Sequence, residues 1–498
     1  MSSIDAHLPV LQVVVPLLVA PLVTILRPSG LAWAATTATS FMALMIAVGL
    51  TAGALEGDIQ RYEVGAWAAP YGIELAVDSF GALLLLILTG ASTFALLAGK
   101  ASLDQQIESG RQPLFFSAWL LVLAGLAGIL VSADAFNIFV FMEISSLASY
   151  VLIAGGPDRR ALPAVFKYLM MGTIGATFYL IGIGLIYMMT GTLNLADIQV
   201  RLVDVAGLRP VVVAIGFITV GLGLKAAVFP LHVWLPNAYN FAPHAATVLL
   251  AACAAKVSLY VLLTFDFVVL QPVLPEHDPH FGAFLMPLAV LGILAASAVA
   301  LFEPNLKRLL AFSSVAQIGY ILLGASMVSL PGVTASLMHM FNHALAKGAL
   351  FLAVMCLATR LPSLELDDLA GAAKRMPWTM AAFVVGGLSL IGIPGTAGFT
   401  SKWYLISASL EVGGAGGWLL IGVIVTGSLM AVVYIWRVVE AAWFRVPLAE
   451  PTEVREAPAL MLSVTWLAAA ANVYFGLSPW LQTTLASNGA RMLLGEAP

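Results

Sequence analysis

The sequence predicts an all-α polytopic membrane protein with about fourteen transmembrane helices. Hydrophobic residues make up 61% of the 498 residues and charged residues only 10%, with a mean hydropathy of +0.99. Apolar runs of about 20 residues, the length of helix that crosses the hydrocarbon core of a bilayer, recur from end to end. Basic residues are concentrated in alternate loops. The sequence contains no sign of an appended soluble domain.

The predicted spans follow the apolar runs between polar breaks. The N-terminal MSSIDAHLPV lacks the basic region and cleavage site of a signal peptide, so we expect the first span to remain in the membrane. We interpret Cys253 and Cys356, which both lie in apolar spans, as small buried hydrophobic residues. The approximate spans are 8–26, 31–53, 80–98, 114–132, 136–155, 163–190, 211–230, 243–265, 281–302, 308–329, 333–359, 377–410, 417–438 and 458–478.

Two segments, spans seven and twelve, are expected to be broken helices. Residues 211–241 carry Pro230 and Pro236 in a helical setting, and residues 377–410 contain Gly392, Pro394, Gly395 and Gly398. Proline removes a backbone donor and kinks a helix. At membrane depth such breaks persist only where they are buried in protein or line a wet cavity. Glycines in GTIGATFYLIGIG, by contrast, are expected to permit close helix packing.

Basic residues predict the orientation of the chain. If the N-terminus is outside, the odd-numbered loops face the cytoplasm and hold 13 of the 22 Lys and Arg residues, whereas the outside segments hold four. The remaining five are lysines within spans. This asymmetry follows the positive-inside rule. We therefore expect a multi-pass protein of the cell inner (plasma) membrane with both termini outside.

Ionisable residues inside the apolar runs are the main indication of function, because a charge at mid-membrane is costly and typically marks an ion or proton path. Glu143 lies near the middle of span five; its alternative role is a neutral, hydrogen-bonded packing residue. We expect it to pair with a lysine of a neighbouring helix. The candidate lysines are Lys225, Lys256, Lys347 and Lys402, on spans seven, eight, eleven and twelve, whereas Lys167 is close enough to the surface to snorkel.

Span eleven carries a polar stripe of His339, His343 and Lys347 at i, i+4 and i+8. This spacing places the three side chains on nearly the same helix face. Histidine titrates near neutrality and can relay protons. The alternatives are a purely structural hydrogen-bonded stripe and an HxxxH metal site. The metal site is disfavoured because the glutamate of HExxH and a third ligand are missing.

Further polar residues lie near these spans. His232 and His244 flank the cytoplasmic side of the seventh break and form a candidate proton entrance. Span ten has a partly polar face, available for water or packing, formed by Lys307, Ser313, Ser314, Gln317 and Tyr320. The sequence contains no Walker motif, dinucleotide fingerprint, haem pattern or cysteine cluster. We therefore expect no cofactor, no enzymatic activity of the chain itself and no nucleic-acid partner.

Five stretches resemble the antiporter-like subunits shared by respiratory complex I and the Mrp-type multisubunit monovalent cation/proton antiporters. They are FMEISSLASYVLI, KAAVFPLHVWLPNAYNFAPHAATVLLAACAAK, EPNLKRLLAFSSVAQIGYILLG, FNHALAKGALFL and GIPGTAGFTSKWYL. The resemblance implies two inverted five-helix repeats with broken helices seven and twelve. It also implies that Glu143, Lys225, Lys256, the helix-eleven stripe and Lys402 form a mid-membrane proton axis.

The resemblance also implies a domain organisation. Residues 1–113 would form helices 1–3, 114–266 and 267–442 the two repeats (helices 4–8 and 9–13), and 443–498 helix 14 with a short tail. Lys402 and the short C-terminus are most similar to the D-type members of the Mrp group.

The expected function is that of a proton-translocating subunit of a Na⁺(K⁺)/H⁺ antiporter, with other membrane subunits of the same complex, protons and monovalent cations, and the lipid bilayer as partners. The alternatives are a proton-pumping subunit of a redox-driven complex, either complex I or a membrane-bound hydrogenase, and a non-transporting scaffold. The intramembrane charges disfavour the scaffold.

Overall fold

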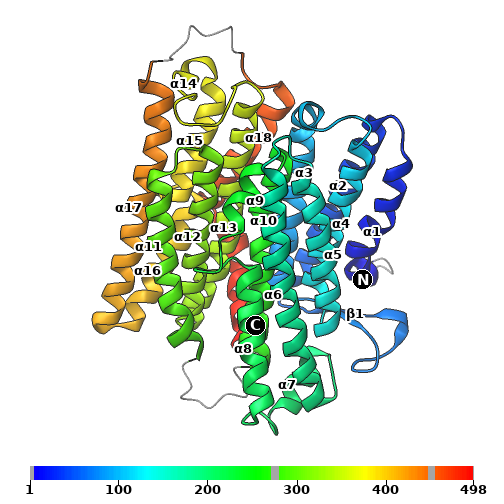
Figure 1. The fold of residues 1–498 in the computed structure, drawn as a ribbon. Coiled ribbons are helices and arrows are strands. Elements are labelled where there is room, and N and C mark those ends of the chain that lie inside the picture. The colour runs from blue at the N-terminus through cyan, green and yellow to red at the C-terminus, as the bar shows by residue number, and fades with distance from the viewer. Residues whose placement is uncertain (1–4, 271–279, 447–454, 497–498) are drawn as a thin grey trace.

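The protein is a bundle of long helices that run along a common direction (Figure 1). The computed structural model describes residues 5–270, 280–446 and 455–496. Within these ranges twelve helices are long and apolar enough to cross a membrane. The two spans predicted to be broken supply the remaining crossings, so the fold agrees with the fourteen spans that the sequence predicts.

The unbroken spans lie at their predicted positions, although the helices predicted over 80–98 and 417–438 extend further, to Gln106 and Phe444. They are α1 (Leu8–Ile25), α2 (Ser29–Leu55), α3 (Ser79–Gln106), α4 (Gln112–Val131), α5 (Ala135–Ala154), α6 (Ala161–Thr190), α10 (His244–Thr264, continued by the π-helix η3, Phe265–Leu270), α11 (Met286–Phe302, preceded by the π-helix η5, His280–Leu285), α12 (Leu306–Ala325), α13 (Leu330–Ala358), α17 (Gly414–Phe444) and α18 (Ala459–Leu477).

Both predicted breaks are present. The first separates α8 (Arg209–Lys225) from α9 (Leu235–Phe241), and the second separates α15 (Pro377–Ile391) from α16 (Ala397–Val412). The first break begins at Lys225, ahead of Pro230, and Pro236 lies in the first turn of α9, where a missing N–H is tolerated. In the second break, Gly392 and Gly395 have φ angles of +93° and +88°, which glycine adopts without a Cβ penalty.

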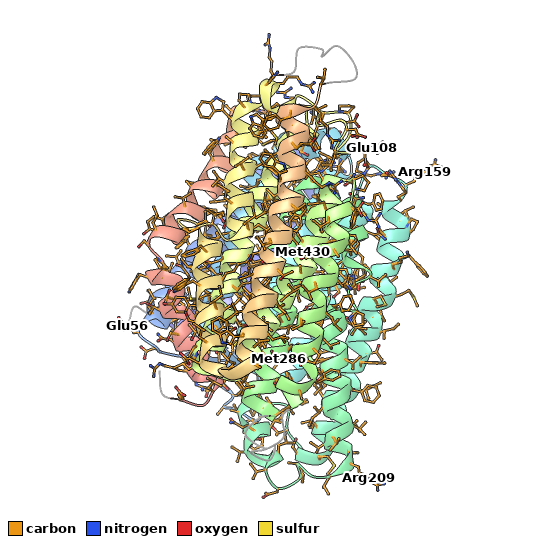
Figure 2. The ribbon with its side chains drawn as sticks, turned by 90° about the vertical axis from the view of Figure 1, so that its left-hand side faces the viewer. Glu56, Glu108, Arg159, Arg209, Met286 and Met430 are labelled. Atoms are coloured by element: carbon orange, nitrogen blue, oxygen red, sulfur yellow. The ribbon has the colours of Figure 1, made fainter. Side chains whose placement is uncertain are left out.

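The ends of the bundle carry different loops. Figure 2 shows Glu108 and Arg159 toward one end and Glu56 and Arg209 toward the other. The short helix α14 (Ala372–Arg375) lies at the first of these ends (Figure 1). We call this first end the basic end, because its loops are those that the sequence predicts to be rich in Lys and Arg.

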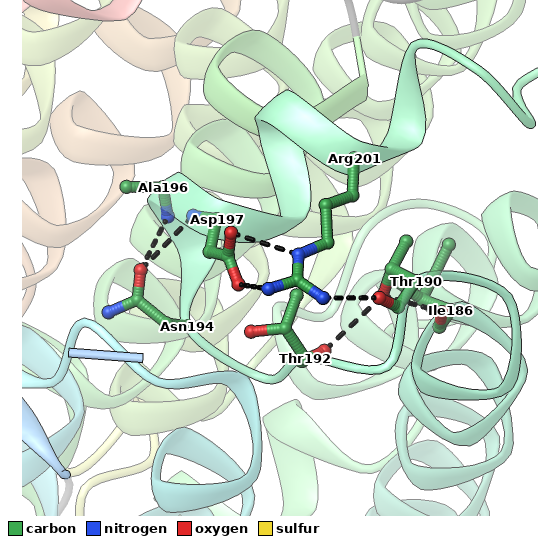
Figure 3. A network of polar contacts seen from close by, with 7 residues as sticks. All are labelled: Ile186, Thr190, Thr192, Asn194, Ala196, Asp197 and Arg201. Carbon is green, nitrogen blue, oxygen red and sulfur yellow. Dashed lines mark hydrogen bonds and ion pairs between the residues drawn. The ribbon is translucent and has the colours of Figure 1, made fainter. Parts of the chain in front are cut away.

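At the opposite end, α7 (Leu195–Leu202) is anchored by a polar network (Figure 3). The Asn194 side chain caps α7 by accepting hydrogen bonds from the backbone N–H groups of Ala196 and Asp197, each at 3.1 Å. The Arg201 guanidinium forms an ion pair with Asp197 at 2.9 Å and donates to the Thr190 carbonyl at the end of α6. These contacts fix α7 across the α6–α8 connection.

Several short elements were not expected from the sequence. Strands β1 (Gln60–Glu63) and β2 (Glu74–Val77) form an antiparallel hairpin in which Gln60 pairs with Val77. The C-terminal segment forms a helix, α19 (Trp480–Leu493), which packs against α3 and α13. The sequence analysis treats this segment as a short tail that follows the last predicted span. The remaining short elements are the 3-10 helices η1 (Asp5–His7) and η2 (Val64–Ala66).

Glycines bring α6 and α8 into backbone contact. A Cβ on Gly175 would lie 2.8 Å from the Gly221 carbonyl oxygen, and one on Gly221 would lie 2.6 Å from the Gly175 carbonyl oxygen. Real side chains cannot make such contacts, so glycine is required on both helices. The close packing predicted for the glycines of GTIGATFYLIGIG is therefore confirmed at Gly175, and its contact with Gly221 holds the end of α8, and with it Lys225, against α6.

Candidate functional site

Glu143 on α5 and Lys225 at the end of α8 form an ion pair. The Lys225 Nζ atom lies 3.2 Å from Glu143 Oε1 and donates a second hydrogen bond to Ser146 Oγ at 2.6 Å. The lysine side chain is 4% exposed and the glutamate side chain 29%, so the pair lies between the interior and one flank of the bundle. Ser146 is three residues after Glu143, on the same face of α5, and supplies a neutral acceptor that remains if the carboxylate moves.

The first helix break leaves Lys225 available for this pair. The Leu224 carbonyl, at the end of α8, accepts hydrogen bonds from the Trp234 indole N–H at 2.9 Å and from the Ala227 backbone N–H at 3.3 Å. Tyr168 of α6 stacks on the Trp234 ring at 4.1 Å with an interplanar angle of 7°. An aromatic residue therefore caps the broken helix, and the lysine beside it does not have to.

At the second break, in contrast to the first, the lysine itself binds the carbonyl groups at the end of the interrupted helix. The Nζ atom of Lys402, on α16, donates to the carbonyls of Leu390 and Ile391 at 3.1 and 2.9 Å, and to Ser428 Oγ at 2.9 Å. The ammonium group thus binds at the C-terminus of α15, where the helix dipole favours a cation. It also lies 4.8 Å from the centre of the Tyr320 ring.

The polar stripe of α13 lies on one face, as predicted. The rings of His339 and His343 are 6.2 Å apart and nearly parallel, at 14°. His339 Nδ1 is 2.9 Å from Ser401 Oγ, and its Nε2 is 2.8 Å from Gln317 Oε1. Both nitrogens of His339 are therefore engaged, which argues against an HxxxH metal site.

His343 is buried on α13 beside His339. It is 3% exposed, and neither ring nitrogen has a hydrogen-bond partner among the described residues. The groups that act on it electrostatically come from three helices: Lys256, Lys347, His339 and Lys402. Buried polar atoms are normally hydrogen-bonded, so an unpartnered imidazole in this position suits a group that exchanges protons with its neighbours.

Lys256 and Lys347 are buried and bonded to neutral oxygens. Lys256 Nζ donates to the Ala251 carbonyl at 2.8 Å, and Lys347 Nζ donates to the Leu310 carbonyl at 2.6 Å and to Ser313 Oγ at 2.5 Å. Their residue exposures are 2% and 0%. Desolvated ammonium groups without a carboxylate are costly to keep charged.

The structure also reveals supporting residues that the sequence pattern did not single out. Asn342 on α13 donates to the Ala397 carbonyl at 2.6 Å and to Thr400 Oγ1 at 3.0 Å, which ties α13 to the second break. Ser401 and Ser428 contact the site as described above. In the sequence Asn342 lies between the two histidines, three positions after His339. Many residues with only a structural role have this spacing, so the spacing did not mark Asn342 as part of the site.

The two candidate entrance histidines lie in different places. His244 begins α10 and lines a cavity of about 210 Å³ at the basic end. His232 instead lies between aromatic rings, 5.3 Å from the Phe229 ring and 6.4 Å from the Phe312 ring, and does not line that cavity. The structure thus separates a pair that the sequence grouped. Lys167 is exposed on α6, in agreement with its interpretation as a snorkelling residue.

Comparisons with known proteins group the chain with antiporter-like membrane subunits. Residues 132–431 match the family described as NADH:quinone oxidoreductase/Mrp antiporter, TM. The chain is 40% identical over 447 residues to the N subunit of NADH-quinone oxidoreductase from Desulforudis audaxviator, covering 88% of this chain and 87% of that protein. It is 30% identical over 402 residues to the D subunit of the Na⁺/H⁺ antiporter from Bacillus subtilis, covering 80% and 79%.

A solved structure has the same fold. A chain of the Mrp complex from Dietzia sp. superposes with a TM-score of 0.89 at 26% identity, and the match covers 99% of this chain and 98% of that one. The family match and this superposition agree with the helical bundle and its interrupted spans.

Proposed function

This chain belongs to the NADH:quinone oxidoreductase/Mrp antiporter family, and we propose that it is a proton-translocating subunit of a multisubunit Na⁺(K⁺)/H⁺ antiporter. It works with other membrane subunits, as the antiporter relatives and the Mrp complex do by their names. Large apolar side chains exposed on α1, α2, α16 and α17 provide flanks for lipid or for those subunits.

One observation carries the proposal: of the four axis lysines, only Lys225 is paired with a carboxylate among the described residues. The other three donate to carbonyls and serine hydroxyls, which accept hydrogen bonds from an ammonium group without fixing its charge. A proton can therefore leave these lysines without leaving an unpaired carboxylate behind. Lysine suits this role because its proton affinity falls readily on burial, unlike that of arginine.

We propose that the Glu143–Lys225 pair controls the charge on the rest of the axis. While the carboxylate faces Lys225, the ammonium is stabilised; when Glu143 is neutralised or turns away, Ser146 alone is a weaker partner. Lys225 then releases its proton toward Lys256, and the histidines of α13 link Lys256 and Lys347 to Lys402. The proposed order is thus Glu143, Lys225, Lys256, His343 with Lys347 and His339, and Lys402.

The chain is further proposed to contain two inverted repeats, residues 114–266 and 267–442. Each contains one interrupted span beside an axis lysine: α8/α9 with Lys225, and α15/α16 with Lys402. Interrupted helices at matching positions of two halves typically mark the ion path of repeat-built transporters. We also propose that the basic end faces the cytoplasm, which would leave both termini outside.

A proton-pumping subunit of a redox-driven complex is the second candidate, favoured by the 40% identity to a NADH-quinone oxidoreductase subunit. The same axis would then move protons outward, driven by electron transfer in partner subunits.

The two functions differ in what drives the protons. The test is Na⁺- or K⁺-dependent proton exchange in everted vesicles that contain the whole complex and no electron donor. Exchange under these conditions supports the antiporter. Proton movement that appears only when a reduced electron donor is supplied would replace the antiporter with the redox-driven pump. A complex that moves no protons under either condition would contradict both.

A further inference from the structure

A polar cavity of about 210 Å³ at the basic end is not explained by the mid-membrane axis. It lies where the α5–α6 loop, the end of α9 and the beginnings of α10 and α12 meet. The residues that matter here are Gln106, Asp158, Arg160, His244, Asn305 and Lys307. Because the loops around it belong to the basic end, the cavity opens on the side that the sequence predicts to be cytoplasmic.

Lys307 is the unusual residue of this cavity. It lies in the first turn of α12, yet the residue is only 3% exposed. Its Nζ atom donates to the Ala242 carbonyl, at the end of α9, at 2.8 Å. Among the described residues this is its one hydrogen-bond acceptor, and no carboxylate forms an ion pair with it. A lysine near a helix end normally extends into water, so this burial needs a reason.

The other charges of the cavity do not neutralise Lys307. Asp158 is engaged by Arg160, whose guanidinium lies 2.6 Å from the carboxylate and also 5.0 Å from the centre of the Phe241 ring. His244 adds an imidazole whose Nδ1 has no hydrogen-bond partner in the described part of the chain. The cavity thus combines a buried amine and an unpartnered imidazole, both of which can carry a proton, with access to the basic end.

A polar face of α12 runs inward from Lys307. Ser314, two turns further along, donates to the Leu310 carbonyl at 3.2 Å, the same carbonyl that accepts from Lys347. Ser313 accepts from Lys347, and Gln317 contacts His339. One helix therefore carries polar groups from the cavity to both the Lys347 and the His339 parts of the axis.

Two buried hydroxyl residues, Tyr239 on α9 and Thr247 on α10, lie on the same helices as the cavity-lining residues Phe241 and His244. Thr247 donates to the Tyr239 carbonyl, and the Tyr239 hydroxyl donates to the Leu250 carbonyl, both at 3.0 Å. Both residues are buried. Their hydroxyl hydrogens can rotate between acceptors, as a proton relay requires.

We propose that this cavity is the proton portal of the axis at the basic end, with Lys307 as the residue that exchanges protons between the cavity and the α12 polar face. The Lys307 ammonium gives its proton to a neighbour on one side, and the resulting amine takes another from the other side. The portal serves either direction of flux. It rests on the proposed proton-translocating function.

Two substitutions separate proton exchange from a structural role. Lys307→Arg keeps a charged donor that can cap the Ala242 carbonyl, but arginine does not release its proton. Lys307→Met removes both properties. We expect both variants, in the intact complex, to lower proton exchange about a hundredfold, the low end for a positioned proton-transfer group. Lys374→Met, an exposed lysine in α14 at the same end, is the matched control and should be unaffected.

A near-normal rate in Lys307→Arg would overturn the portal, because the lysine would then be only a cap. If the complex that carries Lys307→Arg fails to assemble, modification of a thiol placed in the cavity tests the portal instead. Both native cysteines are buried, so Ser363→Cys, which lines the cavity, can be labelled selectively with a bulky charged thiol reagent. Labelling should block exchange, while labelling the exposed Ser109→Cys at the same end should not. Unchanged exchange after complete labelling at 363 would also overturn the portal.

The same assay separates failure of the portal from failure of the proposed function. If the axis variant Glu143→Ala loses exchange while the portal variants keep it, the portal is wrong and the axis remains. If the unmodified complex moves no protons, the proposed function itself is wrong.

Discussion

Removing the carboxylate of Glu143 should abolish most transport without preventing assembly. In Glu143→Ala or Glu143→Gln, Lys225 loses its ion-pair partner at 3.2 Å but keeps the hydrogen bond to Ser146 at 2.6 Å. Breaking a fully buried ion pair costs about 3–5 kcal/mol. Because the Glu143 side chain is 29% exposed and Ser146 remains, we expect about 1.5–3 kcal/mol, the range for a hydrogen bond to a charged group.

That energy sets the size of the transport defect. If it is lost from the step in which Lys225 changes its protonation state, the rate falls about 10- to 150-fold, since each 1.36 kcal/mol corresponds to a factor of ten. The assay is the collapse of a proton gradient in everted vesicles after addition of Na⁺ or K⁺, with complex assembly checked by native electrophoresis.

A double-mutant cycle tests whether the two residues act as a pair. Glu143→Gln combined with Lys225→Ala should be no slower than Lys225→Ala alone, because the interaction is already lost in either single variant. Normal exchange by an assembled Glu143→Ala or Lys225→Ala complex would refute the reasoning, as would fully additive losses in the double variant.

Three further predictions concern other parts of the molecule. Lys402→Glu should keep partial exchange and Lys402→Met much less, because a protonated glutamate can still donate to the Leu390 or Ile391 carbonyl; equal rates in the two would contradict this. Gly221→Leu should lower the thermal stability of the purified complex by forcing α6 and α8 apart, at a cost of about 1–3 kcal/mol. Gly216→Leu, next to open space, should not lower it. Equal melting temperatures of the two variants would argue against the close packing of α6 and α8. Burial acts to raise the pKa of Asp197, but the hydrogen bond and ion pair with Arg201 help to hold that pKa below its usual 3.8. This contact therefore stabilises α7 at neutral pH and is lost in acid as the pH falls through the lowered pKa. The protection of the amides of residues 195–202 against hydrogen exchange, measured relative to the intrinsic rate at each pH, should then fall in acid in the wild type and be low at every pH in Asp197→Asn. An acid response that persists in this variant would mean that another group is responsible.

Much of the fold can be predicted from the order of apolar and polar residues along the chain. The apolar runs define the spans within a few residues, because a helix without solvent must satisfy its backbone internally and be long enough to cross the hydrocarbon. The breaks are visible as proline and glycine clusters. The end of α8 was harder to place, since it falls at Lys225, before the first proline, where the Leu224 carbonyl is bonded to the Trp234 side chain as well as to the Ala227 backbone N–H. The helix α19 was missed because its burial depends on α3 and α13, which lie far away in sequence.

The sequence by itself determined which residues could carry protons: a carboxylate, lysines and histidines inside apolar helices stand out because their desolvation is too costly to be accidental. Only the tertiary structure decided their partners. It gave Lys225 a carboxylate and Lys402 the end of a broken helix, and it left both ring nitrogens of His343 without a hydrogen-bond partner among the described residues. It also divided the two candidate entrance histidines and placed Lys307 beside His244. These outcomes depend on which helices are neighbours and on how each break is capped, and neither can be read from spacing along one chain.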